Sequence, residues 1–269
     1  MPTFDTPEPI VVRVDAAAGS VRLVATDRDD TVVVVRPHDE SRAADVRAAE
    51  QTQVECDNGK LTVSAARRGF ALFRGGAVDI DIALPSRSRL KASMASADVH
   101  AEGGFADCRI SSASGNVDID VVEGNLKVAT ASGSINVQAV AGNVSIAAAS
   151  GSATIGELDG DLVSKAASGD LSVAQLSGGL RAQTASGSVT VATAVRGAIS
   201  AFTSSGEVGV GVAEGTAARL DLITGSGAVT NLLQSADGPA EGDDTLLIHV
   251  RSGSGDIDIH RAVVTYSTT

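Results

Sequence analysis

The chain has 269 residues, of which 43% are hydrophobic but only 2% aromatic, so its apolar volume must come from Val, Ile, Leu and Ala. A net charge of −12 argues against binding to the phosphates of nucleic acids or to an anionic membrane. Twenty-nine Gly among many β-branched residues exclude a mainly helical protein and indicate short strands joined by tight turns. We therefore expect an all-β protein that binds neither nucleic acid nor membrane.

The first 95 residues carry strand patterns at irregular spacing, at 10–14, 20–26, 31–36, 60–64 and 78–84. The only helical pattern is SRAADVRAAEQTQ, at residues 41–53. Turn residues between the strands favour antiparallel hairpins, and a repetitive β structure needs a cap over its first coil. Residues 1–95 are therefore predicted to form an N-terminal antiparallel β cap.

The N-terminal sequence MPTFDTPEPIVV has no basic segment followed by an apolar run, and no apolar stretch is long enough to span a bilayer. We expect a cytoplasmic location on this basis.

Glycines recur every nine residues through the middle of the chain. They lie at Gly115, Gly124, Gly133, Gly142, Gly151, Gly160, Gly169, Gly178 and Gly187. Alternate nonapeptides begin with Ala-Ser-Gly, so the repeating unit has eighteen residues. Gly and the preceding Ser are suited to the corners of a coil, because Gly tolerates positive φ and the Ser hydroxyl can bond to the turn backbone.

Aliphatic residues lie two and four positions after the glycines, which is the period of a strand with one buried face. These predicted core columns are Val117, Ile119, Leu126, Val128, Ile135, Val137, Val144, Ile146, Leu171, Val173, Val189 and Val191. The pattern predicts a single-stranded, right-handed parallel β-solenoid (β-helix) of about nine coils, spanning residues 96–260 and beginning near Ser96. Whether the coil is two-faced or triangular in section stays open.

The repeat becomes irregular towards its end. Gly197 comes one residue late, a long insertion occupies residues 233–244, and LLIHVRSGSGDIDIH is predicted to form the last coil, with Ile257 and Ile259 pointing inward. Residues 261–269 form a C-terminal tail whose Val263, Val264 and Tyr266 are candidates to cap that coil.

Several segments resemble one known family. The opening MPTFDTPEPI, ADVRAAEQTQVE, the DCRISSASGNVDID entry to the repeats and the SGDIDI ending are similar to the bacterial, notably actinobacterial, DUF4097 family of adhesin-like β-strand-repeat proteins. The resemblance covers essentially the whole chain. It implies a parallel β-solenoid and supplies no catalytic residues.

Candidate chemical groups do not form a recognisable active site. Asp118 and Asp120, with Asp98 or Glu102 one coil earlier, are the best candidates for paired carboxylates, but outward acids on a solenoid are normally solvated. The corner serines repeat in every unit, whereas a nucleophile would be unique. They are Ser114, Ser132, Ser150, Ser168 and Ser186. We therefore expect no enzyme activity.

Metal and cofactor sites are not indicated either. Asp120, Asp161, Asp170 and Asp258 are scattered through the register and cannot build a column of calcium ligands. Cys56 and Cys108 have no close-spaced Cys or His partner and are expected to be buried free thiols. The four histidines lie in separate segments without metal-ligand spacing, at His38, His100, His249 and His260.

The distribution of charge ranks the remaining functions. Residues 1–96 carry 13 Lys and Arg against 14 Asp and Glu, whereas residues 97–269 carry 8 against 19. A rigid module whose acidic flat face docks a partner protein fits this asymmetry best. The alternatives are an end-to-end polymer or adhesin-like surface protein, and a carbohydrate-binding or carbohydrate-cleaving β-helix, for which aromatic residues are scarce. A small-molecule ligand is not expected.

Overall fold

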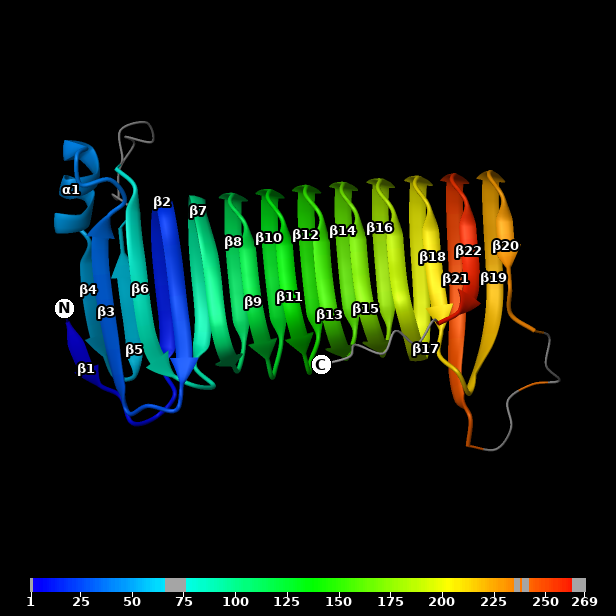
Figure 1. Ribbon diagram of the computed structural model, residues 1–269, viewed down its shortest axis with the longest axis horizontal. Coiled ribbons are helices and arrows are strands. Elements are labelled where there is room, and N and C mark those ends of the chain that lie inside the picture. Colours follow the sequence, from blue (N-terminus) through cyan, green and yellow to red (C-terminus); the bar gives the residue numbers. More distant parts are fainter. Residues whose placement is uncertain (1, 66–75, 235–237, 239–241, 263–269) are drawn as a thin grey trace. The chain divides into compact units, whose positions relative to one another are not determined.

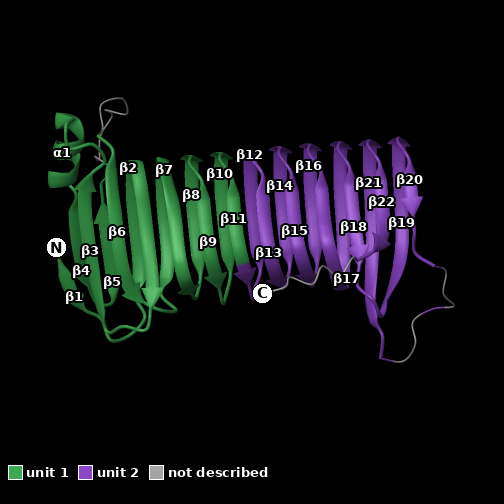
Figure 2. Cartoon of the chain, in the orientation of Figure 1, with its two compact units in different colours: residues 1–138 green, residues 139–269 purple. Residues whose placement is uncertain are grey.

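The chain forms two compact units, residues 1–138 and 139–269 (Figure 2). The structure, a computed structural model, describes residues 2–65, 76–234, 238 and 242–262. Strands dominate both units, and α1 is the one helix within the described ranges. The prediction of an all-β protein with long parallel pairings is confirmed.

The described residues of the first unit form eleven strands and the helix, and Figure 1 shows their arrangement. Its elements are β1 (Thr3–Asp5), β2 (Val11–Thr26), β3 (Asp30–Pro37), α1 (Ala43–Glu50), β4 (Gln53–Asp57), β5 (Lys60–Ser64), β6 (Val78–Pro85), β7 (Arg89–Phe105), β8 (Cys108–Ser114), β9 (Val117–Val122), β10 (Leu126–Ser132) and β11 (Ile135–Val140), the last of which runs into the second unit.

In the second unit the described residues form strands and connecting turns. The strands are β12 (Val144–Ser150), β13 (Ala153–Asp159), β14 (Leu162–Ser168), β15 (Leu171–Ser177), β16 (Leu180–Ser186), β17 (Val189–Ser205), β18 (Val208–Val212), β19 (Thr216–Ser226), β20 (Val229–Asn231), β21 (Asp244–Ser254) and β22 (Ile257–Arg261).

The eighteen-residue repeat is the pairing register of the parallel strands. Leu126 of β10 lies beside Cys108 of β8, and Leu180 of β16 lies beside Leu162 of β14. We call each coil, with its strands, a rung. The late Gly197 corresponds to a shift of register between β15 and β17, after which Leu180 lies beside Ile199, nineteen residues on.

The corners require glycine because successive rungs touch there. Gly133 has φ +120°, and a Cβ on it would lie 2.1 Å from the carbonyl oxygen of Gly115, one rung earlier. Neither the conformation nor the contact leaves room for a side chain. Seven of the nine predicted corner glycines have positive φ, all except Gly124 and Gly142.

The core lies inside the rungs. All twelve predicted inward residues are at most 5% exposed. The structure adds a third inward position that the sequence analysis missed, occupied by Val122, Val140, Leu158 and Leu176, which are at most 3% exposed. Its signal was a Val or Leu two residues before every second glycine.

The first rungs are not in chain order. β2 pairs in parallel with β7, from Val11 beside Arg89 to Ala25 beside Gly103. On its other side β2 pairs in parallel with β5 and β6. Of the strands that the structure describes in residues 2–65 and 76–95, β1, β3 and β4 are the ones that run antiparallel to their partners. Antiparallel hairpins throughout residues 1–95, and winding that begins near Ser96, are therefore wrong: alternation of buried residues is the same in parallel and antiparallel strands.

The rungs also change order in the second unit. β21 lies between β17 and β19, and β22 lies between β18 and β20. The terminal rung is therefore β19 with β20, not the predicted coil that contains Ile257 and Ile259. A strand pattern does not specify which neighbour a strand pairs with. The predicted cap of Val263, Val264 and Tyr266 lies outside the described residues.

Candidate interaction surfaces

A ladder of polar side chains follows the corners. The side chain after a corner residue, which is Ala97 in the first of these rungs and Gly in the others cited here, accepts a hydrogen bond from a backbone N–H in the next rung. Asp98 Oδ1 accepts from the N–H of Asn116 at 2.7 Å, and Asn116 Oδ1 accepts from the N–H of Ser134 at 3.1 Å. The second unit repeats the arrangement, with Asp161 Oδ1 accepting from Gly179 at 2.8 Å. These acids satisfy backbone donors, so part of the acidic excess after residue 97 belongs to the corners.

The outward side chains of the first unit form a second, broader polar surface, which we call the polar face. Arg22 of β2 lies beside Asp81 of β6 and His100 of β7, and His100 lies beside Asp118 of β9. Strands that are distant in sequence thus bring their charges into one register. The polar face comprises Ser20, Arg22, Arg36, His38, Asp79, Asp81, His100, Glu102, Asp118, Asp120, Asn136 and Gln138.

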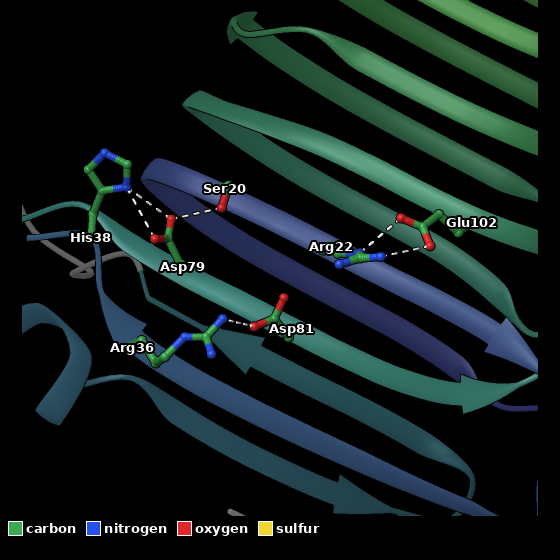
Figure 3. A network of polar contacts seen from close by, with 7 residues as sticks. All are labelled: Ser20, Arg22, Arg36, His38, Asp79, Asp81 and Glu102. Carbon is green, nitrogen blue, oxygen red and sulfur yellow. Dashed lines mark hydrogen bonds and ion pairs between the residues drawn. The ribbon is translucent and has the colours of Figure 1, made fainter.

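Arginines pair with acids across the strands of the polar face (Figure 3). Arg22 binds Glu102 through two nitrogens, at 2.9 and 3.0 Å, and Arg36 binds Asp81. The hydrogen bond and charge of Glu102 raise the pKa of Arg22, and the hydrogen bond from Arg22 lowers the pKa of Glu102. Exposed pairs of this kind contribute little to stability, because water and salt screen them. Their main effect is to hold the side chains in defined positions.

Ser20, His38 and Asp79 meet at one edge of the polar face (Figure 3). Ser20 donates to Asp79 Oδ1 at 2.7 Å, and His38 Nδ1 lies 3.0 Å from the same oxygen. A catalytic serine would instead donate to the histidine, so this cluster is not a serine triad. The hydrogen bond and charge of Asp79 raise the pKa of His38. Partial burial raises the pKa of Asp79, but hydrogen bonds from Ser20 and His38 outweigh it and the pKa is lowered.

The predicted carboxylate candidates also have partners. Asp118 Oδ2 lies 3.1 Å from His100 Nδ1, and Asp118 Oδ1 accepts from Asn136 at 2.8 Å. Asp120 accepts from the N–H of Gly103 at 3.0 Å and from Gln138 at 3.2 Å. Structural hydrogen bonds therefore use these acids, and Asp98 belongs to the corner ladder.

Three of the four histidines lie beside an Asp, which the sequence analysis did not foresee. His249 Nδ1 lies 2.7 Å from Asp221 Oδ2 in the second unit, in addition to the pairs of His38 and His100. His260 Nδ1 instead contacts the Arg261 carbonyl oxygen at 2.8 Å. In the part of the chain that the structure describes, no three His, Cys, Asp or Glu side chains are close enough to hold a metal ion.

Both cysteines are free thiols, but they differ in accessibility. Cys108 is 2% exposed, and burial raises the pKa of its thiol to about 12. Cys56 is only half-buried, and its pKa is also raised, mainly by burial. The expectation of two buried thiols thus fits Cys108 and not Cys56.

The interior of the second unit has a small cavity of about 10 Å³, lined in part by Ser164 and Thr184. The Thr184 hydroxyl has no hydrogen-bond partner. A space of this size holds about one water molecule, so this cavity is too small for an organic ligand. No helix within the described ranges is long and apolar enough to cross a membrane.

The model of the Toastrack DUF4097 family matches residues 12–259. No curated protein sequence matches the chain. Similar crystal structures include a "putative adhesin" from Bacteroides fragilis, with 11% identity, a TM-score of 0.40 and coverage of 96% of this chain and 95% of that chain. A "putative adhesin" from Parabacteroides distasonis has 13% identity, a TM-score of 0.36 and the same coverage of both chains, 96% and 95%. A "putative lipid binding protein" from Parabacteroides distasonis has 12% identity, a TM-score of 0.31 and 96% coverage of each chain.

Proposed function

Because this chain belongs to the Toastrack DUF4097 family, we propose that it is a non-catalytic interaction protein whose polar face docks a partner protein. The observation that carries the proposal is the fixed geometry of that face. Arg22 and Glu102 are 80 positions apart in sequence yet share two hydrogen bonds. Charges ordered before binding lower the entropy lost on association and favour a partner with the complementary pattern.

The mixed charge of the polar face refines the acidic face expected from the sequence. On the side of β2, β6 and β7, the acids are compensated by basic side chains, namely Arg22, Arg36, His38 and His100. Towards β11, Asp118 and Asp120 instead accept hydrogen bonds from the neutral side chains of Asn136 and Gln138. We therefore infer that the partner presents hydrogen-bond acceptors near β6 and cationic or amide groups near β9.

The right-handed winding and the count of about nine coils are also part of this proposal. The hand follows the general rule for parallel crossovers.

The experiment compares protein partners captured by the wild type and by the Asp81→Asn/Asp118→Asn double variant. The substitutions keep the shape and remove charge from two rungs of the polar face. Proteins that are cross-linked to the wild type in cells should be captured at least about tenfold less by this variant. A tenfold loss of affinity corresponds to about 1.4 kcal/mol, and the loss of each charge pair with the partner contributes to it. Quantitative mass spectrometry of the captured proteins measures the depletion.

The matched control is Glu157→Gln/Glu207→Gln, which removes two exposed acids from the second unit. This control should capture the wild-type set. If the Asp81/Asp118 variant captures the same partners in the same amounts as the wild type, the polar face is not the docking surface.

A further inference from the structure

The terminal rung of the second unit ends in an open strand edge. β19 pairs in parallel with β21, from Thr216 beside Asp244 to Ser226 beside Ser254. Within the described ranges no strand pairs with the other edge of its 11 residues. In Figure 1, β19 and β20 lie next to β21 and β22 on the side away from β17 and β18. A long edge presents a row of backbone donors and acceptors that another strand can bind.

The apolar columns are uncovered at the same rung. Leu220 lies beside Ile248, and Leu222 lies beside Val250. Ile248 and Val250 are 0% exposed, whereas both leucines are only half-buried. In the other strand Val229 is 46% exposed beside Ile257, which is fully buried. One more rung of apolar residues would bury this end as the internal rungs are buried.

The outward side chains of β19 indicate which strand fits. Arg219 and Asp221 are exposed and flank Leu220. We propose that β19 pairs antiparallel with β19 of a second copy of this chain, about a two-fold axis through Leu220. Residues equally distant from Leu220 then lie opposite each other on the same side of the sheet. Arg219 faces Asp221 of the second copy, Asp221 faces Arg219 of the second copy, and the two Leu220 side chains meet inside.

Charge complementarity selects this register among the neighbouring ones. An axis through Asp221 would place two carboxylates opposite each other, and an axis through Arg219 would place two guanidinium groups opposite each other. An axis through Leu222 would pair Asp221 with Ile223 and leave no opposite charges in contact. Like charges directly opposite destabilise a strand pair, whereas opposite charges stabilise it.

The contact closes after two copies. An interface in which each copy uses the same patch generates a two-fold dimer, whereas a filament needs a second, different patch. The outer strands of the first unit are short and antiparallel, with 3 residues in β1 and 5 in β4, and they offer no edge comparable to β19. We therefore expect a closed dimer in place of the end-to-end polymer. This surface is separate from the polar face, so either proposal can fail without the other.

The test is sedimentation equilibrium of the full chain over a wide concentration range. We expect the mass to rise from one chain of 26.9 kDa to two chains and to stop there. Arg219→Asp and Asp221→Arg should each weaken the dimer at least about tenfold, because both cross-strand pairs become like-charged. The double variant Arg219→Asp/Asp221→Arg restores opposite charges in the reverse order and should recover the dimer.

Two further variants support the interpretation. Arg181→Asp makes the same charge reversal at an exposed position of β16, away from the edge, and should leave the dimer unchanged. Leu222→Lys places a charge in the uncovered column and should abolish the dimer, while circular dichroism shows an unchanged strand content.

Four results would overturn the proposal: a mass of one chain at every concentration, growth beyond two chains, single charge variants that associate like the wild type, or a double variant that does not recover. A monomeric wild type that dimerises after deletion of residues 263–269 would also overturn it, because the chain's own tail would then be the occupant of the edge.

Discussion

The rung β2 of the first unit and the rung β19 of the second unit have the same strand pattern and different surroundings. The inward residues of β2 are at most 5% exposed, and Val12, Val14 and Leu23 are 0% exposed, because parallel strands lie on both sides. The inward Leu220 and Leu222 of β19 are half-buried because β21 covers them from one side only. The burial of an apolar pair in a stacked structure thus depends on its neighbouring rungs as much as on its own sequence.

The two units also differ in how their outermost parallel rung ends. In the first unit β3 and β4 run antiparallel to β6 and β5, and α1 lies close to β3. A change of strand direction ends the parallel ladder, and short strands blunt the remaining edge. In the second unit the rung β19–β20 keeps the parallel direction to its outer edge. That edge is therefore suited to pairing with another chain.

The largest difference in stability is expected when a charge is introduced at neighbouring positions of the same inward column, once in an internal rung and once in the terminal rung. Val250→Asp buries a carboxylate between β17 and β19 and should cost about 3–5 kcal/mol in the free energy of unfolding or prevent folding. Leu222→Asp, one rung outward, should cost about 1 kcal/mol or less because water still reaches it. Urea unfolding in an Arg219→Asp background measures both without self-association. Similar losses would mean that the outer rung is covered.

A cavity should distinguish the two units with a smaller effect. Leu23→Ala removes a fully buried side chain from β2 and should cost about 2–5 kcal/mol. Leu222→Ala removes the same atoms from a half-buried site of β19 and should cost about 1 kcal/mol. Thermal unfolding at low concentration compares them. A larger loss for Leu222 would contradict the comparison.

Substitution of a corner glycine, a feature that both units share, should reduce stability by a smaller amount. Gly133→Ala forces a Cβ against the carbonyl oxygen of Gly115 at positive φ and should destabilise the first unit by about 1–3 kcal/mol. Gly209→Ala in β18 is the matched control, because nothing lies within 4 Å of the added Cβ and φ is not in the left-handed region. Chemical unfolding that gives equal losses would show that the rungs do not touch at Gly133.

The smallest effect on stability is expected from the titration of His38, which has no counterpart at the β19 edge. Asp79 raises its pKa, so the ion pair stabilises the folded state fully below the unfolded pKa of about 6.5 and is lost as pH rises through the higher folded value. An NMR titration should place the midpoint above about 6.5, and Asp79→Asn should lower it. A midpoint that Asp79→Asn leaves unchanged would contradict the contact.

The repeat region could be predicted from sequence in some detail because each coil recreates the same local environment. Gly115 to Gly187 mark the period, and the apolar residues between them mark the inward side. The polar face could be predicted only in part. Asp118 and Asp120 are recognisable as outward acids, but Arg22 and Asp79 lie in segments with no visible relation to the repeat. Their contacts arise from strand pairing between distant parts of the chain.

The amino-acid sequence by itself determined the all-β class, the eighteen-residue register and the inward columns, because glycine corners and period-two alternation are local properties. Only the tertiary structure decided that β2 lies between β6 and β7, that β21 lies between β17 and β19, and that β19 therefore has an open edge. The physical reason is that backbone hydrogen bonds between parallel strands are nearly independent of side-chain identity. The order of the rungs depends on which long-range pairings bury the most apolar surface, and no single segment carries that information.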